Sequence, residues 1–235
     1  MGLKAAFFDL DDTLYESFQA GDRYAYDRLA AFAQAELGVP GDAFVAAFAE
    51  ARAALARSQP GMPPLHDRVL AAQGALERLG LNAVRHARRV HEVYWQAVYD
   101  KMKRRPGVLE LLDELRAAGV KTAVCTDMLA DVQMEKLERL GLADKVDFLV
   151  SSEEAGQDKP APPIFALALR KCGCLPSEAV MVGDNFRHDV QGALDCGIAG
   201  VWLNWTGLPK PAELRAYTEV KDFAEAADYI RTLLC

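Results

Sequence analysis

The chain has 235 residues, of which 51% are hydrophobic and 26% are charged, and its formal net charge at pH 7 is -7. This composition is ample for a buried core and fits one large domain or two smaller ones. The acidic balance argues against broad attraction to nucleic acid or anionic membranes, although a small basic pocket could still bind an anion. No apolar run approaches the roughly 20 residues that span a bilayer. We therefore expect a soluble protein with no nucleic acid and no membrane as partner.

The N-terminus and the cysteines bear on the compartment. Residues 1–4 lead directly into an apolar strand without a signal-peptide run, and Ala6 stands where a myristoylation motif requires Ser or Thr. The cysteines show no Cys-x-x-Cys spacing, so neither a disulfide framework nor a zinc site is indicated. These features predict a cytoplasmic protein. The five cysteines stand at positions 125, 172, 174, 196 and 235.

The first predicted element is a buried strand over residues 4–9 that runs into an acidic turn. It is short and nearly all apolar, as the inner strands of parallel sheets are. Asp9 and Asp11 lie two residues apart, so an extended backbone would point both side chains the same way and Asp12 away. Clustered carboxylates beside an apolar strand repel one another and lose hydration, a cost that a metal ion or a reaction can offset. The alternative is an ordinary surface turn rich in Asp.

The pattern from Ser17 to about Lys103 is helical, with apolar residues recurring at spacings of three and four. The stretch from Gly38 to Gly41 separates the first two helices, and a breaker-rich loop at residues 58–64 precedes the last two. We predict an all-helical insertion of about four helices. The periodic positions are Ala25, Leu29 and Phe32; Phe44, Phe48, Ala51 and Leu55; Val69, Ala72, Leu76 and Leu79; and Ala87, Val90, Tyr94 and Ala97.

Strands and helices alternate from Pro106 onward, with short connections between them. Such alternation implies right-handed crossovers and a doubly wound parallel α/β sheet. Glycines at 119, 141 and 197 are placed to end three of the helices. The predicted strands are residues 120–125, 146–150, 179–182 and 200–203, and the predicted helices are residues 106–118, 129–140, 163–172, 189–196 and 222–234.

Polar residues follow these strands at the edge where open parallel sheets bind ligands. Carboxylates can hold Mg²⁺ through oxygen, and a hydroxyl and a lysine can contact phosphate oxygens. Singly, each has a structural alternative: Thr126 as an N-cap, Lys159 as a solvated loop residue, Asp184 as a turn acid, Asp189 as an acid at a helix N-terminus. Jointly, their placement favours phosphoryl transfer. In chain order they are Asp9 and Asp11, Thr126 and Asp127, Lys159, Asp184 and Asn185, and Asp189.

Four motifs together closely resemble the haloacid dehalogenase-like (HAD) hydrolase superfamily, and the likeness spans nearly the whole chain. The helical block after the first motif resembles the C1-type cap of that superfamily. The resemblance implies a HAD-like Rossmannoid core, residues 1–15 and 104–235, with a helical cap domain, residues 16–103, inserted after the first strand. The motifs are Asp9-x-Asp11-x-Thr13, Thr126, Lys159-Pro160 and Gly183-Asp184-x4-Asp189.

The resemblance also assigns roles by position. It makes Asp9 the nucleophile and Asp11 the general acid and base. It makes Asp9, the backbone carbonyl of Asp11, and Asp184 the ligands of Mg²⁺. Thr126 and Lys159 would hold the phosphoryl group, and Asp189 would orient Lys159 or a metal-bound water. Thr13 and Asn185 are expected to support this site.

One residue departs from the pattern, since Asp127 stands where the family often has Asn. Only a backbone N–H is needed at this position to contact phosphate, so we still include Asp127 among the phosphate-binding residues. The extra negative charge leaves the local hydrogen bonding open.

The resemblance implies a Mg²⁺-dependent phosphatase that hydrolyses a small phosphomonoester through an aspartyl-phosphate, as a monomer or homodimer. A dehalogenase of the same superfamily also uses an aspartate nucleophile, but such enzymes lack the acid at Asp11 and need no metal. A phosphomutase would share every motif. From a different class, a receiver-type signalling domain or a silent binding protein could carry an acidic pocket, but a receiver chain is far shorter and has no helical insert.

Candidate residues for contacting the leaving group of the substrate lie in and next to the helical block. The alternative role for each is packing in the core of that block. The histidines show no shared spacing for a metal and are interpreted as surface or packing residues. The candidates are Tyr15, Phe18, Arg23, Tyr24, Trp95 and Tyr99, and the histidines are His66, His86, His91 and His188.

Overall fold

A computed structural model describes residues 2–209 and 216–234 of the chain. The chain forms two compact units, residues 1–16 with 103–235, and residues 17–102. Cys235 lies outside the described residues, and the other four cysteines, at positions 125, 172, 174 and 196, are free thiols. Within the described ranges, no helix combines the length and the apolar character that crossing a membrane requires.

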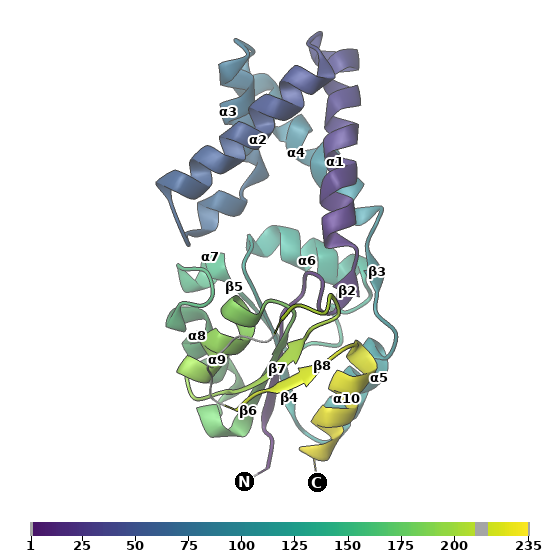
Figure 1. The fold of residues 1–235 in the computed structure, drawn as a ribbon, viewed down its shortest axis with the longest axis vertical. Helices are drawn as coiled ribbons and strands as arrows, with labels where there is room; N and C mark the ends of the chain where they lie inside the picture. The colour runs from purple at the N-terminus through teal and green to yellow at the C-terminus, as the bar shows by residue number, and fades with distance from the viewer. Residues whose placement is uncertain (1, 210–215, 235) are drawn as a thin grey trace. The chain divides into compact units, whose positions relative to one another are not determined.

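The larger unit is built on a six-stranded sheet in which every neighbouring pair of strands is parallel (Figure 1). The order β5-β4-β1-β6-β7-β8 puts β1 between β4 and β6. The strand order therefore reverses beside β1, and ligands bind at the carboxyl edge of such a switch point. This sheet confirms the predicted doubly wound α/β fold. The strands are β1 (Ala5–Phe8), β4 (Lys121–Thr126), β5 (Phe148–Ser151), β6 (Ala179–Gly183), β7 (Ala199–Leu203) and β8 (Thr218–Val220).

Helices cover both faces of this sheet, with α8 and α9 on one side and α5 and α10 on the other (Figure 1). All four residues of β1 are buried, because alternate side chains enter the two apolar layers. On one face Ala5 and Phe7 pack in a cluster with Ile164 and Phe165 of α8. The helices are α5 (Val108–Ala117), α6 (Ala130–Arg139), α7 (Ser152–Ala155), α8 (Pro162–Cys172), α9 (Gly192–Asp195) and α10 (Phe223–Thr232).

The smaller unit packs four α-helices around an aromatic core in which Phe48 stacks on Phe44 and meets the ring of Tyr94 at a tilt of 38°. Gly41 begins the second helix where a Cβ would stand 2.6 Å from the carbonyl oxygen of Ala30, so only glycine permits this close approach. The helices are α1 (Phe18–Phe32), α2 (Gly41–Ser58), α3 (Arg68–Arg78) and α4 (Ala83–Tyr99).

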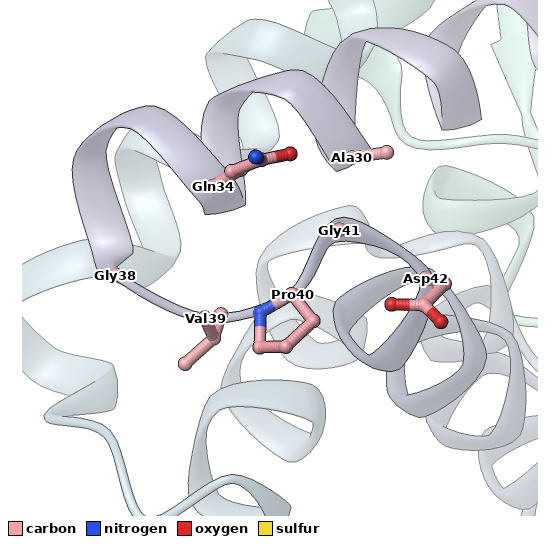
Figure 2. A pocket seen from close by; sticks show the side chains of 7 residues that line it. All are labelled: Ala30, Gln34, Gly38, Val39, Pro40, Gly41 and Asp42. Atoms are coloured by element: carbon pink, nitrogen blue, oxygen red, sulfur yellow. The ribbon is translucent and has the colours of Figure 1, made fainter.

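A cavity of about 550 Å³ lies where α1 and α2 are joined, along the loop from Gly38 to Asp42 (Figure 2). Gln34 and Ala30 form its other wall. Asp42 is its one charged residue, and no Lys, Arg or His lines it, so it offers no positively charged side chain to a phosphate.

The structure adds elements that the sequence pattern did not predict. Tyr15–Glu16 (β2) and Lys103–Arg104 (β3) form a two-stranded antiparallel sheet, and β8 adds a further parallel strand. Two residues are too few to show an alternating pattern. The helix expected over residues 189–196 is a π-helix, η4 (Phe186–Gln191), followed by α9.

Candidate active site

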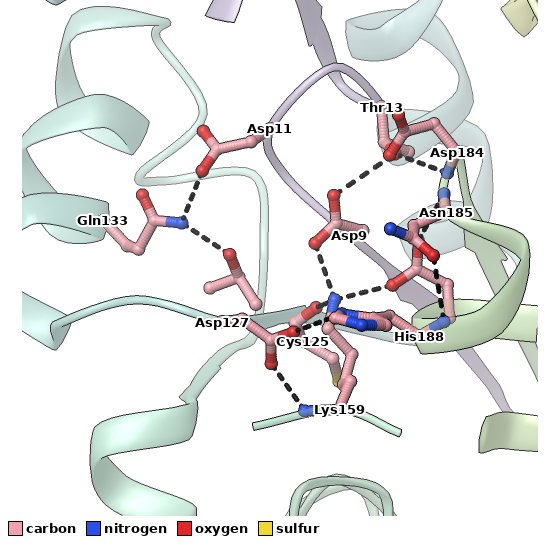
Figure 3. A network of polar contacts seen from close by, with 12 residues as sticks. Asp9, Asp11, Thr13, Cys125, Asp127, Gln133, Lys159, Asp184, Asn185 and His188 are labelled. Atoms are coloured by element: carbon pink, nitrogen blue, oxygen red, sulfur yellow. Dashed lines mark hydrogen bonds and ion pairs between the residues drawn. The ribbon is translucent and has the colours of Figure 1, made fainter. Parts of the chain in front are cut away.

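The turn after β1 brings the first acidic motif to the carboxyl edge of the sheet. The strand ends at Phe8, and Asp12 has a φ of 59°, a left-handed conformation that Asp tolerates because its short side chain bonds locally. β1 ends at Phe8 and residues 11–14 form a turn, so the backbone is not extended over this motif. The two carboxylates contact different side chains, and the expectation that Asp9 and Asp11 point the same way is wrong. Figure 3 shows the Asp9 carboxylate turned toward Lys159 and that of Asp11 turned toward α6.

Lys159 lies in the loop after α7, and its buried ammonium donates to three oxygens. They are Asp9 Oδ1 at 2.7 Å, Asp189 Oδ1 at 2.7 Å and the carbonyl of Cys125 at 2.9 Å (Figure 3). An ammonium has three protons to donate, so all of them are used. Burial disfavours the charge, but Asp189 and Asp9 outweigh burial and raise the pKa of Lys159 well above its usual value. Lys159 is thus a fixed positive charge beside Asp9.

Thr13 connects the turn after β1 to the end of β6. Its hydroxyl lies 3.3 Å from Asp9 Oδ2 and 3.5 Å from Asp184 Oδ1, and its oxygen accepts from the backbone N–H of Asp184 at 3.1 Å. Trp202 Nε1 donates to the backbone carbonyl of Asp184 at 2.9 Å. Asp184 is therefore held at both its backbone groups while its carboxylate faces Asp9.

Asp189 packs directly against Gly183, the last residue of β6. A Cβ on Gly183 would stand 2.2 Å from Asp189 Oδ2, so the strand must end in glycine for this carboxylate to fit. The same oxygen accepts from the backbone N–H of Asn185 at 2.9 Å, and the side chain of Asn185 accepts from the N–H of His188 at 3.1 Å. The position of the Asp189 carboxylate therefore depends on the missing side chain of Gly183 and on the backbone N–H of Asn185.

We expect Gly183→Ala to destabilise the protein by about 1–3 kcal/mol, because the added methyl group must displace Asp189 and with it the contact to Lys159. Thermal unfolding followed by circular dichroism measures the change. The control is Gly2→Ala, where a Cβ meets nothing within 4 Å. Equal melting temperatures for Gly183→Ala and the unmodified chain would contradict this reading of the motif.

The acidic cluster can hold a divalent cation. One oxygen from each of Asp9, Asp184 and Asp189 lies within 4.8 Å of the others. Burial, with Asp189 next in effect, raises the pKa of Asp184 to about 7, and burial also raises the pKa of Asp9 well above its usual value although Lys159 opposes the change. Burial is the main cause, and an excess of negative charge adds to it, since one ammonium faces three carboxylates.

A divalent cation would balance that excess, and oxygen ligands are those that hard cations prefer. Lys159 and the backbone N–H of Asn185 already occupy both oxygens of Asp189. Asp9 and Asp184 keep carboxylate oxygens on the side of Thr13, so these two residues fit the metal site best. This is the pair of side chains that the sequence pattern assigned to the metal.

Asp127 does not point its carboxylate into this cluster. Its Oδ1 accepts from the backbone N–H of Lys159 at 2.7 Å, and its Oδ2 lies 3.3 Å from Nδ1 of His188. The carboxylate therefore fixes the loop that carries Lys159, which resolves the hydrogen bonding left open at this position. His188, interpreted as a surface or packing residue, is half exposed and takes part in this contact.

The Asp11 carboxylate and the Thr126 hydroxyl meet Lys136 and Gln133, which sequence reasoning did not assign to this site, and Tyr15, a candidate for contacting the leaving group. Lys136 Nζ donates to both oxygens of Asp11, and Tyr15 donates its hydroxyl to one of them. Gln133 Nε2 donates to Asp11 and to Thr126 Oγ1 (Figure 3 shows Gln133 with Asp11). The end of β4 and the turn after β1 are thus bridged by α6.

A signal for Gln133 and Lys136 is present in the sequence. Both fall on the buried stripe of α6, together with Val132 and Leu137, and both are completely buried. Polar residues at apolar positions of a helix cost stability unless they have partners, so such a break in the pattern points to a polar site.

Three of the remaining candidates, Tyr24, Trp95 and Tyr99, have ring contacts inside the helical unit. Trp95 is buried between the rings of Tyr94 and Tyr99, and Lys101 Nζ lies 4.3 Å from the centre of the Tyr24 ring. No group of three metal-ligating side chains that includes a histidine is found among the described residues. These contacts are those of a packed helical unit.

Comparisons with known proteins agree with this geometry. The family described as haloacid dehalogenase-like hydrolase matches residues 3–197. A ribulose-1,5-bisphosphate 5-phosphatase of Halopiger xanaduensis is 38% identical over 226 residues, which cover 94% of this chain and 90% of that protein. A glyceraldehyde 3-phosphate phosphatase of Methanopyrus kandleri is 32% identical and covers 98% of both chains.

Among solved structures, a 2-haloacid dehalogenase from Pseudomonas syringae pv. Tomato superposes with a TM-score of 0.82 at 28% identity, covering 98% of this chain and 99% of that one. The family match covers strands β1, β4, β5 and β6, the helical unit and every residue of the acidic site. The chain belongs to the haloacid dehalogenase-like hydrolases.

Proposed function

We propose that the chain is a Mg²⁺-dependent phosphatase that hydrolyses small phosphomonoesters through an aspartyl-phosphate on Asp9. The observation that carries the proposal is the pairing of Asp9 with Lys159 at 2.7 Å, with Asp184 in the same acidic cluster and Asp11 in the same turn. A nucleophile, a fixed cation, a metal site and a separate carboxylate for protons are the parts that phosphoryl transfer needs.

In the first step, an oxygen of Asp9 forms a bond to phosphorus while the bond from phosphorus to the ester oxygen breaks. Asp11 gives its proton to the leaving oxygen, which departs as an alcohol. The hydroxyl of Thr126 binds a non-bridging oxygen, and Lys159 binds another with the proton that it gives to Asp9 in the free protein. Negative charge spreads over these oxygens in the transition state. Mg²⁺, when bound at Asp9 and Asp184, neutralises the charge of phosphate and carboxylates.

In the second step, Asp11 takes a proton from water as the water oxygen attacks phosphorus. The bond between phosphorus and Asp9 breaks, which releases inorganic phosphate, restores the carboxylate of Asp9 and leaves Asp11 protonated, as it was before the first step. Asp189 keeps Lys159 in place throughout through the contact at 2.7 Å. Each residue ends the cycle in its starting state.

Two kinds of support separate this proposal from a dehalogenase. Dehalogenation uses neither a proton-transferring acid nor a metal, so Asp11 and the unbalanced charge at Asp184 would have no purpose. The relatives at 38% and 32% identity are named as phosphatases of short phosphorylated sugars. We therefore propose a small phosphorylated sugar or a similar short phosphomonoester as the substrate.

The remaining assignments are also proposals. Residues 17–102 would act as the cap domain that selects among phosphomonoesters, and the protein would act in the cytoplasm as a monomer or homodimer. A screen of phosphorylated sugars, nucleotides and short acids in the presence of Mg²⁺ tests the substrate, and size-exclusion chromatography with light scattering tests the oligomeric state.

We expect hydrolysis of an aryl phosphate to require Mg²⁺ and to stop with EDTA. Asp9 cannot approach a phosphate dianion beside Asp184 without a cation to reduce the repulsion. The measurement is the initial rate after exhaustive chelation, and the control is recovery of the rate when excess Mg²⁺ is added. Undiminished turnover in chelated protein would exclude the metal assignment.

A further inference from the structure

The Asp11 carboxylate is held on all sides by neighbouring side chains. Oδ1 accepts from Tyr15 and from Lys136 Nζ at 2.6 Å, and Oδ2 accepts from Lys136 Nζ at 2.9 Å and from Gln133 Nε2 at 3.4 Å. A carboxylate has about four lone-pair positions, so these contacts use all of them. The contact to Gln133 is the longest and hence the weakest of the set.

The amide of Gln133 can face this site in one orientation only. With Nε2 toward Asp11 and Thr126, the amide donates to a carboxylate oxygen and to a hydroxyl oxygen. With the amide reversed, its oxygen would face an oxygen of Asp11, and both hydrogen bonds that Nε2 donates would be lost. Because Nε2 donates into Thr126 Oγ1, the proton of that hydroxyl is available to donate to a phosphate oxygen.

Lys136 and Gln133 lie three residues apart on α6 and therefore share one face of the helix. Both are completely buried, and Gln133 Oε1 has no hydrogen-bond partner among the described residues. An apolar pair would fill the same positions without the cost of removing an ammonium and an amide from water. A contribution to stability therefore does not explain why Lys136 and Gln133 occupy these positions, whereas a role in holding the carboxylate of Asp11 does.

We propose that Lys136 and Gln133 are positioning residues of the reaction: Lys136 fixes the carboxylate of Asp11, and Gln133 couples Asp11 to Thr126. The inference rests on the proposed phosphatase function. Oδ2 of Asp11 has the weaker set of contacts, since its contact to Gln133 is 3.4 Å long, while Lys136 contacts both oxygens. Neither positioning residue touches the phosphoryl group.

The test is a double-mutant cycle with Lys136→Met and Asp11→Asn. We expect Lys136→Met to lower kcat for an alkyl phosphate by about 10- to 100-fold, as expected when a catalytic group is misplaced, with KM changed by less than about threefold. In the Asp11→Asn background the same substitution should cause no further loss in the rate of dephosphorylation, because Lys136 acts through Asp11.

The control is Lys145→Met. Lys145 makes a matching two-oxygen contact to Asp113, at 2.8 and 2.9 Å, elsewhere in the same unit. The substitution Lys145→Met should leave kcat and KM at their wild-type values. Gln133→Leu should weaken competitive inhibition by inorganic phosphate by about 3- to 10-fold, since the hydroxyl of Thr126 loses its orientation.

The outcomes separate this inference from the proposed function. If the wild-type protein forms no phosphoenzyme with any phosphomonoester, the proposed function is wrong and the inference falls with it. If the wild type is active but Lys136→Met matches it, or if the losses multiply in the double variant, only the inference is overturned. If the Lys136→Met variant does not fold, Lys136→Gln replaces it in the experiment, because this substitution keeps a polar side chain of similar length. Failure of both variants to fold would show that Lys136 is structural and would also overturn the inference.

Discussion

Replacing Asp9 with Asn should abolish both turnover and the labelling of the protein by substrate phosphate. Asp9 supplies the oxygen that bonds to phosphorus, and the uncharged amide is a poor nucleophile. We expect kcat to fall by at least about 10⁴-fold. Losses of this size are typical when the nucleophile is removed from a set of catalytic residues that act together. Rapid acid quench followed by mass spectrometry of the peptide that contains Asp9 measures the labelling.

Asp11→Asn should behave differently although Asp11 lies in the same turn. Its carboxylate contacts Lys136 rather than the acidic cluster, so the variant should still bind Mg²⁺ and inorganic phosphate. An aryl phosphate has a good leaving group that needs little protonation, so the first step should proceed. The second step needs a base to deprotonate water, and phosphoenzyme should therefore accumulate.

Asp12→Asn is the matched control, because it makes the same change of charge in the same turn and Asn also tolerates the left-handed conformation at this position. It should be phosphorylated and turn over at close to the wild-type rate. Melting temperatures are measured for all three variants, since Asp11→Asn leaves the buried ammonium of Lys136 without its carboxylate. Phosphorylation of Asp9→Asn at this turn, or wild-type turnover by Asp11→Asn, would contradict the division of labour.

Much of the fold could be predicted because its strands are short, apolar and followed by helices. β1, β4, β6 and β7 lie within two residues of their predicted ends. The short elements β2, β3 and β8 were not predicted, because their pairing depends on partners that are distant in sequence rather than on a local pattern. The helix expected at residues 189–196 starts earlier, at Phe186, because Asn185 caps it by accepting from the N–H of His188.

The acidic part of the site could be predicted because the carboxyl ends of β1, β4 and β6 meet at one edge of the sheet. Asp9, Asp184 and Asp189 meet there through topology alone. The direction of Asp11 could not be predicted, because β1 ends at Phe8 and the chain enters a turn at Asp11. The contact between Lys136 and Asp11 spans 125 positions of sequence, and nothing local to either residue specifies it.

Lys159→Ala should lower turnover of an aryl phosphate by on the order of 100-fold or more, because a buried charge-assisted contact to the phosphoryl oxygens is lost where charge accumulates. The same change removes the cation that lies between Asp9 and Asp189, at 2.7 Å from each. Those carboxylates then repel one another in a buried site, so the chain should also lose about 3–5 kcal/mol of stability. Initial rates at saturating Mg²⁺, together with chemical denaturation, measure the two effects.

The control is Lys171→Ala, which removes a lysine that donates to the carbonyl of Leu149 at 2.8 Å and to Glu154 at 2.6 Å, away from the acidic cluster. It should leave turnover within about threefold of wild type, as is usual for a partly exposed ion pair outside a site. Lys159→Gln separates the two effects of the substitution at Lys159, because its amide still donates to the carboxylates but carries no charge. A folded Lys159→Gln protein that keeps more than a third of the wild-type rate would show that the charge of Lys159 does not act on the phosphoryl group. A rate as low as that of Lys159→Ala, in protein that has regained stability, would assign the loss to catalysis rather than to folding.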